Sequence, residues 1–141
     1  MQRIERAAYH GDMDPSSLAH PAHWTLGWSL VLAGFASGAA LGLGFLSPEF
    51  LGGYSSPRRR LLRLGHIALV ALGMLNVLFA LAPVPVAGTT AASVASLGLA
   101  IGALSMPLAC AFTAWRERLR VLFPVPVVAL VAGAVAALGG A

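Results

Sequence analysis

An all-α bundle of four transmembrane helices, forming a polytopic integral membrane protein, is the fold expected from this sequence. Of the 141 residues, 58% are hydrophobic and only 10% are charged. The mean hydropathy is +0.82, and the apolar residues fall in four long runs. Soluble domains are typically about 45–50% apolar and about 25% charged. Because a short chain cannot bury such an excess in water, the composition excludes a soluble globular domain.

Residues 1–23 are polar and are expected to form an extracytoplasmic tail ahead of a membrane domain at 24–141. The tail carries three of the four histidines. His20 and His23 are spaced so that they could share a Zn or Cu ion. Without cysteine partners or a regular repeat this pattern is weak, so we favour a solvated tail and predict no metal site.

The four apolar runs span about 24–46, 61–82, 90–115 and 121–140. A helix needs about 20 apolar residues to cross the hydrocarbon core of a bilayer, and each run is long enough. Transmembrane strands would instead show alternating segments of about ten residues. The chain is therefore expected to cross the membrane four times.

All nine basic residues are arginines, and seven of them flank the predicted spans: Arg58, Arg59, Arg60, Arg63, Arg116, Arg118 and Arg120. Positive residues remain preferentially in the cytoplasm. This rule places the first and third connections inside and both termini outside. Such clusters are typical of contacts with anionic lipid headgroups and not of a continuous nucleic-acid footprint. Exclusive use of arginine, with abundant alanine and glycine, is typical of a GC-rich bacterial genome. The expected location is therefore a bacterial inner (plasma) membrane.

Small residues recur at four-residue spacing and predict close, glycine-zipper packing between helices. They are Gly34, Gly38 and Gly42 in the first run, Gly98 and Gly102 in the third, and Gly133 in the fourth. Inside lipid, helices associate through van der Waals contact, which small residues permit. Asn76 lies in the middle of the second run, where an amide is expected to form a hydrogen bond across helices worth about 1 kcal/mol.

His66 is the candidate ligand-binding residue because it is the one histidine inside a predicted span. Ionisable residues in a membrane are candidate functional sites. A neutral imidazole could bind a quinone or ligate haem b, with Met106 or Cys110 of the third run, or a second copy of His66, as the other axial ligand. The simpler interpretation is a hydrogen bond to a carbonyl or a lipid headgroup, so no cofactor is required.

None of the four runs contains Asp or Glu, which excludes proton-coupled exchange through a buried carboxylate. No catalytic constellation is apparent, and one cysteine cannot form an intrachain disulfide. The sequence therefore favours a non-catalytic accessory or assembly subunit, with other membrane subunits or copies of itself as partners. Two alternatives stay open. The first is a haem b- or quinone-binding electron-transfer protein using His66, and the second is a homo-oligomeric channel lined by the glycine and serine faces of the first and third helices.

Overall fold

The computed structural model describes residues 20–82 and 90–139. It contains four long helices, α2 (Pro21–Gly44), α3 (Pro57–Ala80), α4 (Thr90–Trp115) and α5 (Pro124–Gly139), with short 3-10 turns η2 (Phe50–Gly52) and η4 (Glu117–Leu122). Four helical segments, the last combining η4 with α5, are long and apolar enough to cross a membrane. This confirms the prediction of an all-α fold with four apolar helices. Nearly all of the predicted tail lies outside the described residues.

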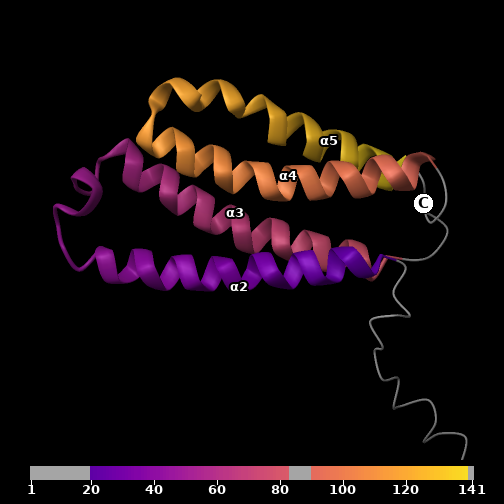
Figure 1. The fold of residues 1–141 in the computed structure, drawn as a ribbon, viewed down its shortest axis with the longest axis horizontal. Coiled ribbons are helices and arrows are strands. Elements are labelled where there is room, and N and C mark those ends of the chain that lie inside the picture. Colours follow the sequence, from indigo (N-terminus) through magenta and orange to yellow (C-terminus); the bar gives the residue numbers. More distant parts are fainter. Residues whose placement is uncertain (1–19, 83–89, 140–141) are drawn as a thin grey trace, which may run out of the picture.

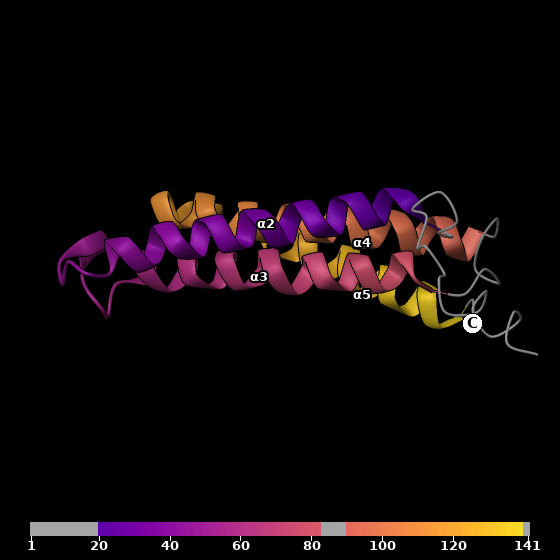
Figure 2. The same ribbon diagram turned by 90° about the horizontal axis from the view of Figure 1, so that it is seen from below.

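The long helices form a row in chain order, in which each packs mainly against its neighbours (Figure 1). Successive helices run in opposite directions, and the turned view shows α2 and α3 in front of α4 and α5 (Figure 2). Extensive contacts join α2 to α3, α3 to α4, and α4 to α5, whereas α2 touches α4 only slightly. No substantial contact joins α2 to α5. The four helices thus form an open row that contact between α2 and α5 does not close.

Prolines determine where three of the helices begin. Pro21, Pro57 and Pro124 are the first residues of α2, α3 and α5, a position where a missing N–H group costs little. Consequently α2 and α3 start three and four residues before the runs predicted at 24 and 61. In contrast, α5 starts at Pro124, three residues after the predicted 121, although Phe123 before it already has α-helical backbone angles. The chain before Pro124 forms η4 instead.

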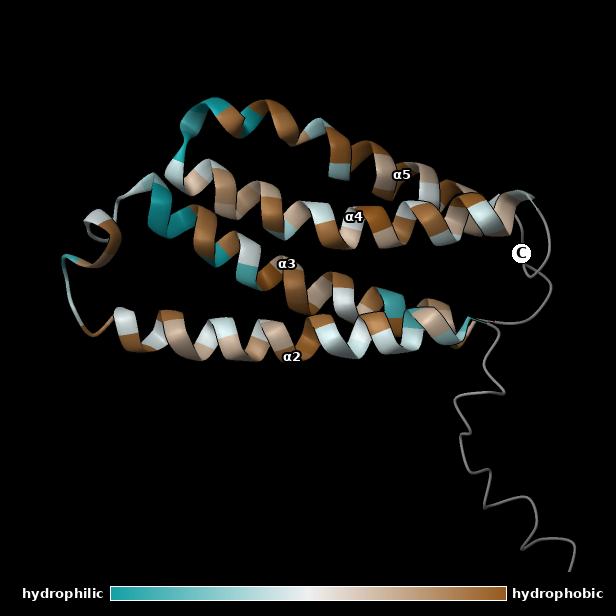
Figure 3. Cartoon of the chain, viewed as in Figure 1, coloured by the Kyte–Doolittle hydropathy of each residue, from teal (hydrophilic) through white to brown (hydrophobic). Residues whose placement is uncertain are grey.

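The charged residues of the described chain gather at one end of the row. Figure 1 shows the connection 45–56 and η4 at the same end, and Figure 3 shows hydrophilic residues at the start of α3 and in η4. The residues are Glu49, Arg58, Arg59, Arg60, Arg63, Arg116, Glu117, Arg118 and Arg120. The antiparallel helices thereby bring two arginine clusters, far apart in sequence, to one level.

Side-chain size is distributed in the reverse of the soluble pattern. The completely buried apolar residues include Ala80, Ala95 and Ala103, whereas Leu32 and Leu97 are more than 60% exposed. Water-soluble monomers rarely expose large contiguous apolar patches. Small residues inside and large aliphatic residues outside are instead the arrangement that suits helices packed in lipid.

Glycines allow the close approach of neighbouring helices. A Cβ built at Gly34 would lie 2.5 Å from a methyl group of Val70 on α3, and one at Gly38 would lie 2.5 Å from Cε1 of His66. The sequence pattern missed the pair Gly27 and Gly73, where a Cβ on either residue would come within 2.8 Å of the other's carbonyl oxygen.

On the other side of the row, Gly98 and Gly133 bring α4 and α5 together, and Gly102 lies against Leu130. Gly42 is different. A Cβ there would meet no atom of another helix within 4 Å, so Gly42 does not pack against another helix of the described chain. It lies in the last turn of α2, at the end where the connection to α3 begins.

Candidate functional site

A buried polar network joins three helices at the end opposite the arginines. His23 of α2 is 4% exposed and Asn76 of α3 is fully buried. Nδ1 of His23 donates to Oδ1 of Asn76 at 2.6 Å, and Asn76 Nδ2 donates to the carbonyl of Leu72 at 2.8 Å. Ser96 Oγ of α4 lies 2.8 Å from Nε2 of His23. Because Nδ1 carries the proton, the hydroxyl of Ser96 donates to Nε2 of the neutral ring.

This network has a structural role, because each buried polar group in it has a partner. Unpaired polar groups are costly in an apolar interior, so the network specifies how α2, α3 and α4 align. The prediction that His23 lies in a solvated tail is wrong: Pro21 starts α2, and the ring of His23 turns into the core. Within residues 20–82 and 90–139, no three His, Cys, Asp or Glu side chains gather as a metal site.

His20 lies at the edge of this network, immediately before α2. Its ring stacks on Phe79 with a centroid distance of 4.4 Å and lies 6.1 Å from the ring of His23. Burial, followed by the nearby His23, lowers the pKa of His20 from its ordinary value of 6.5. Both effects disfavour the imidazolium form.

We therefore expect the protein to lose stability as the pH falls from 7.5 to 5. The unfolded chain binds a proton at His20 as the pH passes through about 6.5, whereas the folded chain binds it only at lower pH, so stability is greatest above that range. Thermal unfolding of the detergent-solubilised protein, measured at several pH values, tests this. His20→Gln should unfold with a weaker dependence on pH, and an unchanged dependence would contradict the assignment.

His66 forms a second, separate polar contact near the arginine end. Its Nδ1 lies 2.8 Å from the carbonyl oxygen of Gly34 on α2 and 3.4 Å from Oγ of Ser37. A carbonyl can only accept, so Nδ1 carries the proton and Nε2 of the neutral ring has a free lone pair. Gly38 provides the space into which the ring packs. No described residue forms a hydrogen bond with Nε2.

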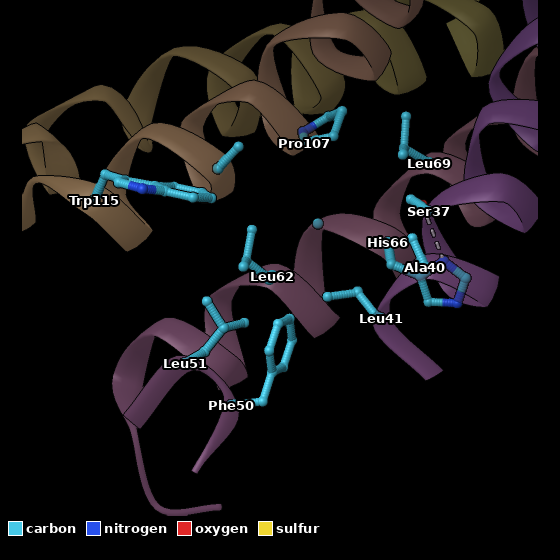
Figure 4. A pocket seen from close by; sticks show the side chains of 12 residues that line it. Ser37, Ala40, Leu41, Phe50, Leu51, Leu62, His66, Leu69, Pro107 and Trp115 are labelled. Carbon is cyan, nitrogen blue, oxygen red and sulfur yellow. Dashed lines mark hydrogen bonds between the residues drawn. The ribbon is translucent and has the colours of Figure 1, made fainter. Parts of the chain in front are cut away.

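A cavity of about 480 Å³ adjoins His66 between α2, α3 and α4. Figure 4 shows apolar side chains around most of it, with His66 and Ser37 at one side. The lining residues from the connection and α4 include Phe50, Leu51 and Trp115. An apolar cavity with few polar groups is the usual form of a site for a small hydrophobic ligand.

The structure does not bring the second proposed haem ligand to this cavity. Met106 precedes Pro107, which lines the cavity, but Met106 itself is not part of the lining. Cys110 is fully buried, and its Cβ lies close to Gly65 of α3. His66 is thus the one imidazole at the cavity, with no described thioether or thiol beside it to complete an axial pair.

Two arginines near the cavity, Arg59 and Arg63, pack against aromatic rings. Arg59 of α3 is only 8% exposed, and its guanidinium carbon lies 4.1 Å from the ring centroid of Phe45. Arg63, one turn later, lies 5.8 Å from the same ring and 5.5 Å from that of Tyr54. The other five arginines predicted to contact lipid are exposed: Arg58, Arg60, Arg116, Arg118 and Arg120.

The sequence draws attention to the histidines and arginines of these sites but does not reveal which residues they contact. His23 meets a partner 53 residues away in the chain. Phe45 and Tyr54 meet Arg59 and Arg63 because the connection between α2 and α3 folds back on the start of α3. One local signal was present: Arg59 and Arg63 are four residues apart and therefore share a helix face, whereas Arg58 and Arg60 point elsewhere. No family model matches the sequence, and neither a curated protein nor a solved structure shows significant similarity to it.

Proposed function

We propose that this chain is a multi-pass integral membrane protein with its arginine-bearing connections in the cytoplasm and both termini outside. The reversed distribution of side chains is the observation that supports it, because large aliphatic residues cover the outside and small ones fill the interior. The charged residues at one end of the row agree with the positive-inside rule. We place it in a bacterial inner membrane.

Within the membrane, we propose that the protein serves as a non-catalytic accessory or assembly subunit of a larger complex. The openness of the row supports this proposal. The helix α5 packs mainly against α4, and Val128, Val131 and Val135 on its other face are each more than half exposed. The side chains of His23, Asn76 and Ser96 form hydrogen bonds with one another, which is a structural arrangement and not a catalytic one.

Gentle extraction followed by native mass spectrometry tests this role. We expect the 14.5 kDa chain to leave the membrane in a heteromeric particle with partners of defined mass. Val131→Trp, on the exposed face of α5, should release partners that bind there, whereas Leu32→Trp on the exposed face of α2 is the matched control. A particle containing only one copy of this chain would contradict the subunit role, and a particle containing several copies alone would favour self-association.

A second candidate function is the binding of haem b, or of a quinone in its reduced quinol form, at His66. It is favoured by the free lone pair on Nε2 beside an apolar cavity. A histidine whose Nδ1–H donates to a carbonyl is oriented as metal-ligating histidines commonly are, and the same lone pair can accept a hydrogen bond from a quinol hydroxyl. Because Met106 does not line the cavity, haem ligation by two axial residues would need a second copy of the chain.

Absorbance spectroscopy and ligand extraction distinguish binding at His66 from a purely structural role of this residue. Protein purified after expression with ample haem should show a Soret band if His66 ligates iron, and His66→Ala should abolish the band. If His66 binds a quinol, organic extraction of the purified protein should recover the quinol, and extraction of the His66→Ala variant should not. Colourless protein that carries no quinol would rule out the candidate and leave the Nδ1 contact to Gly34 as the only role of His66.

The packing of the glycine residues disfavours the homo-oligomeric channel, whose pore they would have to line. Gly34 and Gly38 of α2 lie against α3, and Gly98 and Gly102 of α4 lie against α5. Helices of the same chain therefore cover the glycine faces. Conductance measurements on liposomes containing the purified protein should accordingly show no channel activity.

A further inference from the structure

Arg59 is a buried cation with no anionic partner among the described residues. The side chain is 8% exposed, its Nε is fully buried, and no described residue accepts a hydrogen bond from this atom. Neither a carboxylate nor a carbonyl of the described chain pairs with the guanidinium. A guanidinium carries five N–H donors, and burying an unpaired charge is costly. Within the described chain, no anionic group compensates this charge.

Arg63 has the same deficit and lies beside the same two rings. Its Nε is also fully buried without a partner, and its guanidinium carbon is within 6 Å of the Phe45 and Tyr54 centroids. Residues four apart are neighbours on a helix surface, so two positive charges lie side by side. Cation–π contacts with the rings contribute only about 0.5–2 kcal/mol each and provide no acceptor for the N–H groups.

The arginine pair lies next to residues that line the apolar cavity, although neither arginine is itself part of the lining. The ring of Phe45, which contacts Arg59, lies 6.0 Å from the ring of Phe50, and Phe50 lines the cavity. Leu62, between the two arginines on α3, lines it as well, and Figure 4 shows Phe50 and Leu62 on the same side of the space. An occupant with an anionic head and an apolar tail would therefore match both features.

We propose that Arg59 and Arg63 bind the phosphate group of an anionic phospholipid whose acyl chain enters the cavity lined by Phe50, Leu62 and Trp115. Guanidinium groups bind phosphate through paired N–H donors, which would give the buried Nε–H groups of both arginines an acceptor. Arginine clusters on the cytoplasmic side of transmembrane helices form pockets for anionic headgroups. The inference rests on the proposed membrane location, and it distinguishes two arginines of specific function from neighbours that only set topology.

Quenching of Trp115 fluorescence by brominated lipid is the test. Trp24→Phe and Trp28→Phe together leave Trp115 as the one tryptophan of the chain. In liposomes of zwitterionic lipid, a small fraction of brominated phosphatidylglycerol should quench Trp115 more strongly than the same fraction of brominated phosphatidylcholine. In the variant with Arg59→Gln and Arg63→Gln this preference should disappear. In the matched control with Arg58→Gln and Arg60→Gln, which loses two exposed charges, the preference should persist.

Two further measurements keep the test decisive. Native mass spectrometry of the unsubstituted protein needs no folded variant, and it should show phosphatidylglycerol retained at activation energies that strip phosphatidylcholine. The second measurement is the thermal stability of lipid-free protein in detergent with and without inorganic phosphate. Stabilisation by phosphate that depends on Arg59 and Arg63, without a preference for phosphatidylglycerol, would overturn the lipid assignment in favour of a free anion. Equal quenching by both brominated lipids would overturn the proposal, as would equal loss in both double variants. A chain found in the soluble fraction would instead contradict the membrane location itself.

Discussion

Replacing Gly98 with valine should separate α4 from α5 and destabilise the protein by about 1–3 kcal/mol or more. A Cβ at this position would lie 2.6 Å from the carbonyl oxygen of Ala129 and 2.7 Å from Cα of Gly133. Both are backbone atoms, so no change of side-chain rotamer can relieve the overlap and the helices must move apart. Because α5 has no other extensive helix contact, its attachment depends on this approach. Unfolding in mixed detergent, followed by tryptophan fluorescence, measures the loss.

Valine substitutions at two other glycines should destabilise the protein less than Gly98→Val does. Valine at Gly102 would meet the side chain of Leu130, which can rotate, so the loss should be smaller. A Cβ at Gly42 would meet no atom of another helix within 4 Å, so valine there should change stability by less than about 0.5 kcal/mol. The same loss at all three positions would show that helix propensity, and not contact between α4 and α5, determines the effect.

Removing the imidazole of His23 should have the second large effect, a loss of about 1–2 kcal/mol. His23→Ala leaves Oδ1 of the fully buried Asn76 without its donor and Oγ of Ser96 without its acceptor. Asn76→Ala should cost a similar amount because it strands Nδ1–H of His23. Since both substitutions break the same hydrogen bond, the double variant should lose less than the sum of the two.

Ser29→Ala is the matched control for this network. The Ser29 hydroxyl donates to the Thr25 carbonyl of its own helix on an exposed face, so its removal should leave stability nearly unchanged. The measurement is a double-mutant cycle from unfolding free energies in detergent. Additive losses at His23 and Asn76 would mean that the two side chains do not interact in the folded protein.

Local composition predicts the helices well, because length and hydropathy are properties of contiguous segments. The four apolar runs alone predict four helices, and prolines at 21, 57 and 124 account for the shifts in where three of them begin. The openness of the row was not predictable. It depends on which face of each helix meets a neighbour, and Gly42 has the same spacing as Gly34 and Gly38 without facing α3.

The polar sites were harder to predict because their partners are distant in sequence. The sequence predicts that His23 belongs to a solvated tail, because its partner Asn76 is 53 residues away and leaves no local signal. Placing Pro21 at the start of a helix would have included His23 in the first span. For Arg59 the sequence predicts contact with lipid headgroups, but only the fold shows that its side chain is buried under Phe45 while Arg58 and Arg60 stay exposed.

Side-specific cysteine labelling in intact cells tests the central claim, that four helices cross the membrane with the arginines inside. In a Cys110→Ala background, Ser55→Cys introduces a thiol at an exposed position in the connection at the arginine end, and Thr90→Cys introduces one at the exposed start of α4. A membrane-impermeant maleimide should label the Thr90→Cys protein in intact cells and the Ser55→Cys protein only after permeabilisation. The reverse pattern would contradict the orientation, and labelling of both positions in a chain recovered without detergent would contradict the membrane fold.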